Sequence, residues 1–362
     1  MASATAISQV LVFWVGGRDV IAGRLSVGEL IAINLFVANL AWPTLAIGWM
    51  LSMWQRGIAS WSRIQDMLRA APSITMPKSP SRLGTQAATQ TTVTANAKTP
   101  IFSLNTVSTS PDTKIDILKD LTLSINNDDF TAFVGRTGSG KTMLIDVLTR
   151  LVPVSRGIYA YRGQHTDQLD PAAIRRDIAY APQDSFLFSI SIRDNILLGR
   201  YGITEEEKND PFDIDKVIHD AGLTADISQF EKGLDTIVGE RGVTLSGGQK
   251  QRLSLARALA ADRPILILDD TLSALDAKTE TEVLANLRNS PSISTLIVVS
   301  HRMSAVRDAD IIHVLDEGRI VQSGDFNTLA TMPGLFQTLY LSHATTDSPS
   351  PSARELSLKG ES

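Results

Sequence analysis

The chain has 362 residues, of which 34 are basic and 39 acidic, and it contains no cysteine. The lack of cysteine excludes disulfide scaffolds, thiolate zinc sites and thiol nucleophiles, and the net charge of −5 argues against a nucleic-acid partner bound through a basic surface. The mean hydropathy of +0.03 is high for a soluble protein, which predicts that the apolar residues are concentrated in one part of the chain.

The apolar residues gather near the N-terminus. Residues 30–53 form a run of 24 residues without a charge, long enough to cross a hydrocarbon core as one helix. Residues 2–17 are short for a span, and we interpret them as the end of a preceding transmembrane helix rather than as a signal peptide. A buried helix of a soluble protein is the alternative for residues 30–53. Four charged residues are expected in the connection between the two helices: Arg18, Asp19, Arg24 and Glu29.

Basic residues follow the second helix and indicate its orientation. Arg56, Arg63, Arg69, Lys78 and Arg82 lie within one short stretch, and this bias places the C-terminal end of the helix in the cytoplasm. The chain is therefore predicted to be a multi-pass protein of the cell membrane, in contact with the lipid bilayer, whose remaining residues are cytoplasmic.

Composition divides the chain into four predicted segments. Residues 1–70 are a truncated transmembrane domain with one full helix at about 30–53 and a cytoplasmic extension. Residues 71–100 are a flexible linker, and residues 344–362 a disordered polar tail, because both are rich in small polar residues. Residues 101–343 alternate apolar runs (FTAFVG, DIAYA, PILILDD, TLIVVSH, IIHVL) with helical stretches. This predicts an α/β domain with a largely parallel sheet covered on both faces, in which RIVQSG pairs with IIHVL.

Residues 135–142 (GRTGSGKT) fit the phosphate-binding pattern GxxxxGK[ST], between a predicted strand and a predicted helix. Glycines let backbone N–H groups surround phosphate oxygens, and the helix N-terminus adds partial positive charge. Lys141 is expected to reach the β- and γ-phosphates and Thr142 to bind Mg²⁺. A glycine-rich loop without a ligand is the alternative. The candidate phosphate-binding residues are Gly135, Thr137, Gly138, Ser139, Gly140, Lys141 and Thr142.

A second strand, residues 265–268, ends in Asp269 and Asp270. Ligands of open α/β sheets bind at the carboxyl ends of the strands, so this end is expected to lie beside the phosphate loop. Asp269 is then the candidate magnesium carboxylate.

Five further segments occur in a diagnostic order. They are YAPQDSFLF with Gln183, GERG at residues 239–242, LSGGQ at residues 245–249, SALD ending at Asp276, and VVSH ending at His301. Together with the phosphate loop they resemble the nucleotide-binding domain of an ABC transporter over roughly residues 101–342, and LSGGQ is highly specific. GERG resembles the exporter subgroup, and residues 1–70 resemble the end of an exporter's membrane domain. The resemblance implies a P-loop NTPase fold with a RecA-like parallel core, an antiparallel β part and a helical signature subdomain.

The resemblance also implies roles for single residues. In the family two cassettes sandwich each ATP between one phosphate loop and the partner's signature. Gln183 would sense Mg²⁺ and the attacking water, His301 would contact the γ-phosphate, and Asp276 would act across the dimer interface. ATP and Mg²⁺ are the implied cofactors, with Thr142, Gln183 and Asp269 at the metal. The residues implied to contact ATP held by the partner are Ser246, Gly247, Gly248 and Gln249.

Two positions depart from the family pattern. Asp270 stands where the family has the glutamate that polarises the attacking water, and its shorter side chain would cost about 10²-fold in rate through misplacement. The aromatic residue on which adenine stacks is absent from residues 107–111 (VSTSP). This combination, with an intact signature, resembles one subunit of a heterodimeric exporter with unequal ATP sites.

The predicted function is that of an ATP-binding and ATP-hydrolysing ABC exporter subunit whose own site is slow. Its partners would be a second half-transporter and a transported small molecule, lipid or peptide, without nucleic acid. A heterodimer is favoured; the alternative is a homodimer in which Asp270 is equivalent to glutamate. One alternative is a regulatory or non-transporting ATP-binding fragment. Another is a soluble ABC ATPase, which residues 30–53 and GERG disfavour. Exporters of this type have six spanning helices, so we expect the chain by itself not to form a transport path.

Overall fold

The computed structural model describes residues 2–70, 72–74, 77, 100–110, 115–201, 212–239 and 245–346. The chain divides into two compact units, Met1–Pro72 and Ser73–Ser362. Most of the predicted linker and tail, and residues 240–244 within and after GERG, lie outside the described residues.

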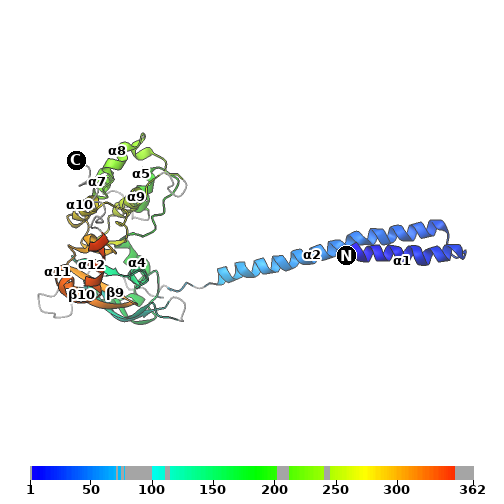
Figure 1. The fold of residues 1–362 in the computed structure, drawn as a ribbon, viewed down its shortest axis with the longest axis horizontal. Helices are drawn as coiled ribbons and strands as arrows, with labels where there is room; N and C mark the ends of the chain where they lie inside the picture. The colour runs from blue at the N-terminus through cyan, green and yellow to red at the C-terminus, as the bar shows by residue number, and fades with distance from the viewer. Residues whose placement is uncertain are drawn as a thin grey trace, which may run out of the picture. The chain divides into compact units, whose positions relative to one another are not determined.

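The N-terminal unit consists of two helices, α1 (Ala2–Ile21) and α2 (Val27–Arg69). The chain reverses between them, so that α1 lies beside the first part of α2 (Figure 1). The predicted connection was too wide. Arg18 and Asp19 belong to the last turn of α1, where Asp19 pairs with Arg24 at 2.6 Å. Glu29 belongs to the first turn of α2, because it forms a capping box with Ser26.

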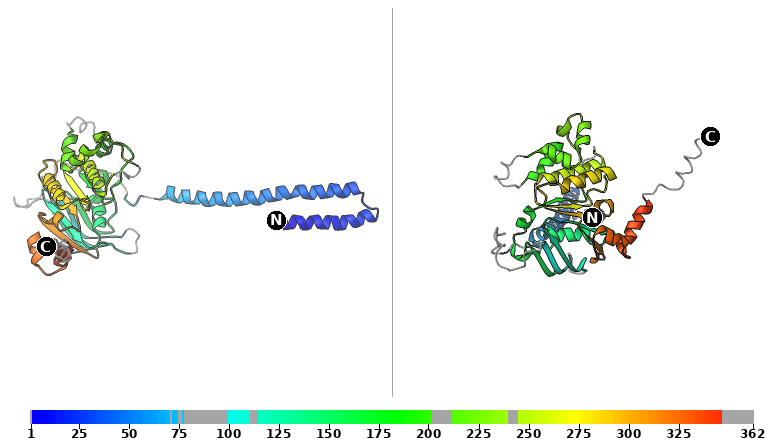
Figure 2. Two further views of the ribbon diagram at one scale, coloured as in Figure 1. Left: turned by 45° about the horizontal axis from the view of Figure 1, so that its top comes forward. Right: turned by 90° about the vertical axis from the view of Figure 1, so that its left-hand side faces the viewer.

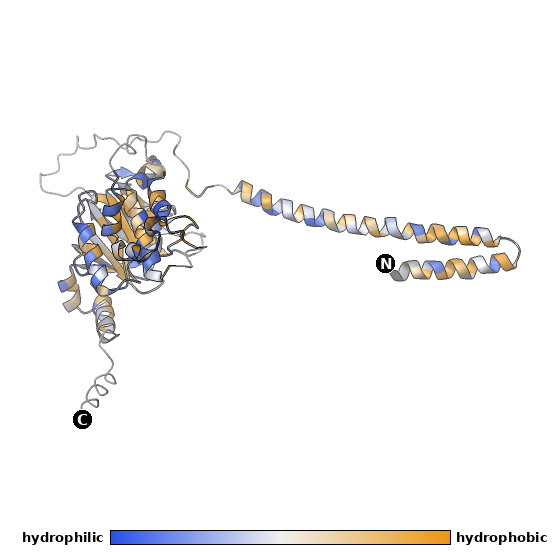
Figure 3. Cartoon of the chain, turned by 90° about the horizontal axis from the view of Figure 1, so that it is seen from above, coloured by the Kyte–Doolittle hydropathy of each residue, from blue (hydrophilic) through white to orange (hydrophobic). Residues whose placement is uncertain are grey.

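Helix α2 is longer than the predicted span, because the predicted extension continues it without interruption to Arg69. Within the described residues it is the one helix long and apolar enough to cross a membrane. Most of its described apolar side chains are exposed, as for Trp42 and Trp49. Figure 3 shows that the hydrophobic residues dominate the half of α2 next to the connection. Exposed side chains of this kind are unfavourable in water and favourable in lipid or against other helices.

The second unit is built on a six-stranded sheet of order β10-β9-β3-β8-β7-β6. Neighbouring strands are parallel except for the antiparallel pair β9 and β10. Both the predicted parallel sheet and the predicted pairing of IIHVL with RIVQSG are confirmed. The strands are β3 (Phe130–Gly135), β6 (Ile178–Ala181), β7 (Ile265–Asp269), β8 (Thr295–Val299), β9 (Ile311–Asp316) and β10 (Arg319–Gly324).

A four-stranded antiparallel sheet of order β2-β1-β4-β5 forms the second β layer. It is the antiparallel part that the family resemblance implies. The two sheets meet where the backbone N–H of Lys119 donates to the carbonyl oxygen of Gly318 at 2.9 Å. The strands are β1 (Pro100–Thr109), β2 (Leu118–Asn126), β4 (Arg156–Tyr161) and β5 (Gln164–His165).

The helices of this unit cover the sheets and form a helical region containing α5, α7, α8 and α9 (Figures 1 and 2). The α-helices are α3 (Lys141–Leu148), α4 (Pro171–Arg176), α5 (Ile192–Leu197), α7 (Ile214–Asp220), α8 (Thr224–Gln229), α9 (Gly247–Ala260), α10 (Ala277–Arg288), α11 (Phe326–Thr331) and α12 (Leu335–Thr346). Short 3₁₀ helices cover Thr166–Gln168, Leu198–Arg200, Gly233–Asp235 and Ser304–Val306.

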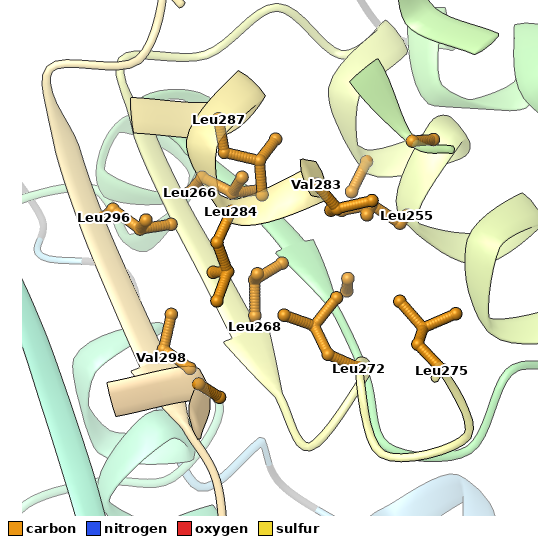
Figure 4. Close-up of a cluster of buried hydrophobic side chains, with 14 of the residues drawn as sticks. Leu255, Leu266, Leu268, Leu272, Leu275, Val283, Leu284, Leu287, Leu296 and Val298 are labelled. Atoms are coloured by element: carbon orange, nitrogen blue, oxygen red, sulfur yellow. The ribbon is translucent and has the colours of Figure 1, made fainter. Parts of the chain in front are cut away.

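Two hydrophobic cores lie on opposite faces of the parallel sheet, because successive side chains of a strand point in opposite directions. Leu266 and Leu268 of β7 belong to one core, together with Leu284 of α10 (Figure 4). Ile265 and Ile267 belong to the other, with α3 and the antiparallel sheet. Burial on both faces explains why β7 is apolar at consecutive positions.

One polar side chain lies inside this packing. His313 of β9 is 6 % exposed and stacks on the Phe133 ring of β3, with the ring centroids 5.4 Å apart. Its Nδ1 lies 2.7 Å from the Ser323 hydroxyl, and its Nε2 has no hydrogen-bond partner within the described structure. Burial lowers the pKa of His313 to about 4, because the site disfavours the charged imidazolium.

His313 is expected to make the fold acid-sensitive. The unfolded chain gains this proton near pH 6.5 and the folded chain near pH 4, so stability is lost as the pH falls through that window, by up to about 3 kcal/mol. Thermal unfolding of the full chain in detergent should therefore show a smaller loss between pH 7 and pH 4.5 for His313→Leu than for wild type. Parallel pH curves for the two proteins would contradict this assignment.

Candidate active site

The phosphate loop, residues 135–142, connects β3 to α3 and borders a cavity of about 470 Å³. Gly140 caps α3 with φ at 102°, a backbone conformation that suits glycine. The cavity brings together residues far apart in the sequence, and the carboxyl end of β7 lies at the phosphate loop, as expected for an open α/β sheet. Within the described part of the chain it is lined by Ile117, Gly135, Thr137, Gly138, Gly140, Lys141, Thr142, Met143, Gln183, Asp269, Asp270, Val299, Ser300 and His301.

Lys141 is the cation of this cavity. Its Nζ donates to the carbonyl oxygens of Gly135 at 2.8 Å and Arg136 at 2.9 Å. Burial lowers the pKa of Lys141, while the charges of Asp269 and Asp270 raise it. The ammonium group is thus held at the phosphate loop by weak carbonyl acceptors, which an anionic ligand can replace with stronger, charge-assisted hydrogen bonds.

Asp269 ends β7 and is only 2 % exposed. Burial raises its pKa, whereas a hydrogen bond with Thr142 lowers it. Tyr180 of the neighbouring strand donates a long hydrogen bond, 3.4 Å, to Oδ2. A buried carboxylate beside a hydroxyl, at the edge of the cavity that Gln183 also lines, provides hard oxygen ligands that fit Mg²⁺.

Asp270 and His301 contact each other directly. His301 Nδ1 lies 2.8 Å from Asp270 Oδ1. Asp270 adopts φ of 50°, a left-handed conformation that Asp tolerates better than most residues, and its backbone N–H donates to the carbonyl oxygen of Val299 at 2.8 Å. The family resemblance implies separate roles for these two residues; the structure adds that their side chains form a hydrogen-bonded pair.

Gln183 follows β6 and is exposed. It lines the main cavity and a second one of about 430 Å³ that shares Asp270 and His301. The structure thus brings together the three side chains predicted to be catalytic.

The signature residues 246–249 are not among the residues lining this cavity in the described structure. Ser246 is the N-cap of α9, where it forms a capping box with Gln249. Gln249 also donates to the buried carboxylate of Asp226 at 3.1 Å. Ser246 and Gly247 are exposed. The signature therefore forms an accessible helix N-terminus. The backbone N–H groups of this first turn point away from the body of the helix.

Asp276 likewise lies outside the cavity lining of the described chain. It is the N-cap of α10, and its carboxylate accepts from the Thr279 backbone N–H at 3.0 Å and from the Thr279 hydroxyl at 2.7 Å. These two hydrogen bonds lower the pKa of Asp276. Within one subunit this residue acts as a helix cap, so any role across an interface depends on a partner.

Gln251 was missed by the sequence analysis. Its Nε2 donates to the Ser273 hydroxyl at 3.0 Å, and its Oε1 accepts from the Ala274 backbone N–H at 2.8 Å. The Ser273 hydroxyl in turn donates to the carbonyl oxygen of Asp270 at 2.8 Å. The signature helix is thereby joined to the segment after the acidic strand, a contact that no sequence pattern indicates.

The region of the missing aromatic residue is partly described. Val107, Ser108 and Thr109 are buried in β1 and present no surface to a ligand. Ile117 and Met143 line the cavity instead, and neither was predicted as a site residue.

Comparison with known proteins decides the family. Residues 118–273 match the family model described as ABC transporter. The chain carries the nucleotide-binding domain of an ABC transporter. Along the ABC domain the phosphate loop is followed by the signature and then by the acidic strand.

The relatives of the ABC domain include exporters. The probable multidrug resistance ABC transporter ATP-binding/permease protein YheI of Bacillus subtilis is 37 % identical over 328 residues, covering 90 % of this chain and 52 % of the relative. The cyclolysin secretion/processing ATP-binding protein CyaB of Bordetella pertussis is 34 % identical over 332 residues, covering 91 % of this chain and 43 % of the relative. The chain thus spans about half the length of these relatives.

A solved structure, that of a bacterial Atm1-family ABC exporter with ATP bound, superposes with a TM-score of 0.68 and 28 % identity. The match covers 95 % of this chain and 57 % of that one. The likeness extends over almost the whole described chain, including the helices before the ABC domain.

Proposed function

We propose that the chain is an ATP-hydrolysing subunit of a membrane exporter, with its ABC domain in the cytoplasm and α1 and α2 within a multi-pass membrane domain. Two ABC domains would close on ATP and Mg²⁺, and the closure would drive efflux of a small molecule, lipid or peptide. The observation that carries the proposal is the cavity that unites Lys141, Asp269 and His301, together with an exposed signature that lies outside it.

The chemistry at this cavity needs three contributions from the chain. Lys141 and the loop N–H groups would bind the phosphates, and Thr142, Asp269 and Gln183 would hold Mg²⁺, which neutralises charge developing on the phosphates. The Asp270–His301 pair would orient the attacking water and accept its proton. Because Asp270 is one methylene shorter than glutamate, we infer that this water is poorly placed and hydrolysis at this site slow.

The intact signature supports a heterodimer. Its exposed Ser246 and Gly247 would complete an ATP site on a partner that carries glutamate after its magnesium aspartate. In such a pair the partner's site performs most of the hydrolysis, while the site of this chain mainly holds ATP and stabilises the closed dimer.

The test is the ATPase activity of the full chain reconstituted with such a partner. Replacing the partner's catalytic glutamate by glutamine should remove nearly all activity, whereas Asp270→Asn should leave most of it. Asp262→Asn is the matched control, because Asp262 is exposed and has nearly the same backbone angle, φ of 51°. Equal losses from the partner's substitution and from Asp270→Asn would contradict the unequal sites.

A regulatory ATP-binding subunit without hydrolysis is the second candidate, and the short side chain of Asp270 favours it. A single-turnover measurement with the partner's glutamate already replaced separates the two. Slow phosphate release that Asp270→Asn abolishes supports hydrolysis by this chain; no release at all supports the regulatory subunit.

A further inference from the structure

Tyr180 of β6 lies on the same face of the parallel sheet as the candidate magnesium carboxylate. β6 pairs in parallel with β7, and Tyr180 lies opposite Ile267. Side chains of a strand alternate between the two faces of a sheet, so Asp269 points to the face of Ile265 and Ile267, which belong to the core that contains α3. Tyr180 packs against that same core. The tyrosine and the carboxylate are therefore neighbours on adjacent strands.

The length of the tyrosine lets it reach Asp269. Asp269 is two residues beyond the register partner of Tyr180. Adjacent strands are about 4.8 Å apart and two residues span about 6.6 Å, so the two Cα atoms are about 8 Å apart, a distance that a tyrosine side chain can bridge. The Tyr180 hydroxyl lies 3.4 Å from Asp269 Oδ2. Because a phenol is protonated at neutral pH and a carboxylate only accepts, Tyr180 is the donor.

The carboxylate of Asp269 is held by two elements of the fold. Asp269 is 2 % exposed, and it forms hydrogen bonds with Thr142 of α3 and with Tyr180 of β6. Thr142 is itself a candidate ligand of the metal. Tyr180, by contrast, is not among the cavity-lining residues of the described structure, and its ring is anchored in the core. Tyr180 is thus an outer partner of the carboxylate, fixed by the sheet.

We propose that Tyr180 is a positioning residue of the magnesium site, which holds the Asp269 carboxylate in the orientation that binds Mg²⁺ together with ATP. This inference rests on the proposed function. Hydrogen-bonded outer partners orient the ligands of a metal, and removing one typically costs about 10- to 100-fold in metal affinity. Because the hydrogen bond of Tyr180 is long, we expect an effect of about tenfold, the lower end of this range. The phosphate loop makes no use of this hydroxyl, so ATP binding without metal should be unaffected.

The test is calorimetric binding of a non-hydrolysable ATP analogue to the full chain in detergent, once with Mg²⁺ and once with EDTA. Tyr180→Phe keeps the ring and removes only the hydroxyl. It should weaken binding with Mg²⁺ by about tenfold and leave binding in EDTA unchanged within about twofold. Tyr161→Phe is the matched control, because Tyr161 also donates to an aspartate, Asp177, and is absent from the cavity lining that the structure describes. It should change neither affinity.

A double-mutant cycle shows whether the tyrosine acts through the carboxylate. Asp269→Asn by itself should remove most of the tightening that Mg²⁺ produces. Adding Tyr180→Phe to Asp269→Asn should then cause no further loss, because the group that Tyr180 orients is gone. A loss from Tyr180→Phe of equal size in both backgrounds would overturn the inference.

Three other results would overturn the inference alone. They are unchanged binding with Mg²⁺ in Tyr180→Phe, an equal loss in Tyr161→Phe, or a parallel loss of Tyr180→Phe binding in EDTA. The last would show that the tyrosine supports the phosphate loop and not the metal ligand. Failure of wild type to bind the analogue, or tightening by Mg²⁺ that survives in Asp269→Asn, would overturn the site assignment of the proposed function, and the inference with it.

Discussion

Lys141→Ala is expected to weaken MgATP binding by about 10²- to 10³-fold. The side chain supplies the cation of the cavity, and each charge-assisted hydrogen bond that it would make to the β- and γ-phosphates is worth about 1.5–3 kcal/mol. ATPase activity of a reconstituted pair should fall with the occupancy of this site. Calorimetric titration of MgATP into the full chain measures the effect.

A lysine on the surface controls for the loss of charge. Lys278 of α10 is 87 % exposed and pairs only loosely with Glu282, at 3.9 Å, so Lys278→Ala should bind MgATP as wild type does. Truncating Lys141 also removes the donor to the carbonyl oxygens of Gly135 and Arg136, so unfolding curves must accompany the titration. Wild-type affinity in a folded Lys141→Ala protein would contradict the assignment of the phosphate site.

Glu280→Ala is expected to destabilise the ABC domain by about 1.5–3 kcal/mol, because it removes a charge-assisted hydrogen bond from Arg302, whose side chain is 32 % exposed and keeps part of its hydration. Glu280 of α10 is 1 % exposed, and its Oε2 accepts from Arg302 Nη1 at 2.8 Å. Its other oxygen accepts from the Ser304 hydroxyl. The same Arg302 nitrogen donates to the carbonyl oxygen of Leu275 at 2.6 Å. Removing the Glu280 carboxylate would therefore also loosen the contact between Arg302 and the segment of Leu275.

The consequence should reach the active site, since Arg302 directly follows His301. We expect slower phosphate release from this chain's own site, measured in a single turnover with the partner's catalytic glutamate replaced, and little change in MgATP affinity, because Lys141 and the phosphate loop are untouched. Glu282→Ala on the same helix is the matched control: Glu282 is 63 % exposed, and its loss should cost less than about 1 kcal/mol. Equal denaturation midpoints for the two variants would show that the buried ion pair adds nothing to stability.

The strand–loop–helix around Lys141 was predictable, since all of its signals are local. An apolar strand, glycines at turn positions and a following helical pattern lie within residues 130–148. The parallel sheet was predictable for a related reason: a strand buried on both faces is apolar at consecutive positions, as residues 265–268 are. The connection between α1 and α2 was predicted too wide, because charge was taken as a sign of a turn, whereas Asp19 and Glu29 serve as helix-end partners.

Contacts between distant segments could not be predicted from residue patterns. The hydrogen bond between Asp270 and His301 joins residues 31 positions apart, and the contact of Gln251 with Ser273 joins residues 22 positions apart. Both depend on which strands are neighbours and how the loops between them close. Ile117, the residue before β2, is a further case, since it has no chemical feature that marks it as lining the cavity.

The sequence by itself thus determined the features that short-range chemistry specifies: a long apolar helix, a phosphate-binding loop, an acidic strand end and a signature at a helix start. The tertiary structure decided how these features meet. It placed Asp269, His301 and Ile117 on one cavity and left the signature exposed outside it. The physical reason is that periodicity and backbone conformation are encoded in contiguous residues, whereas a binding site is made where strand ends converge, and that depends on the order of strands in the sheet.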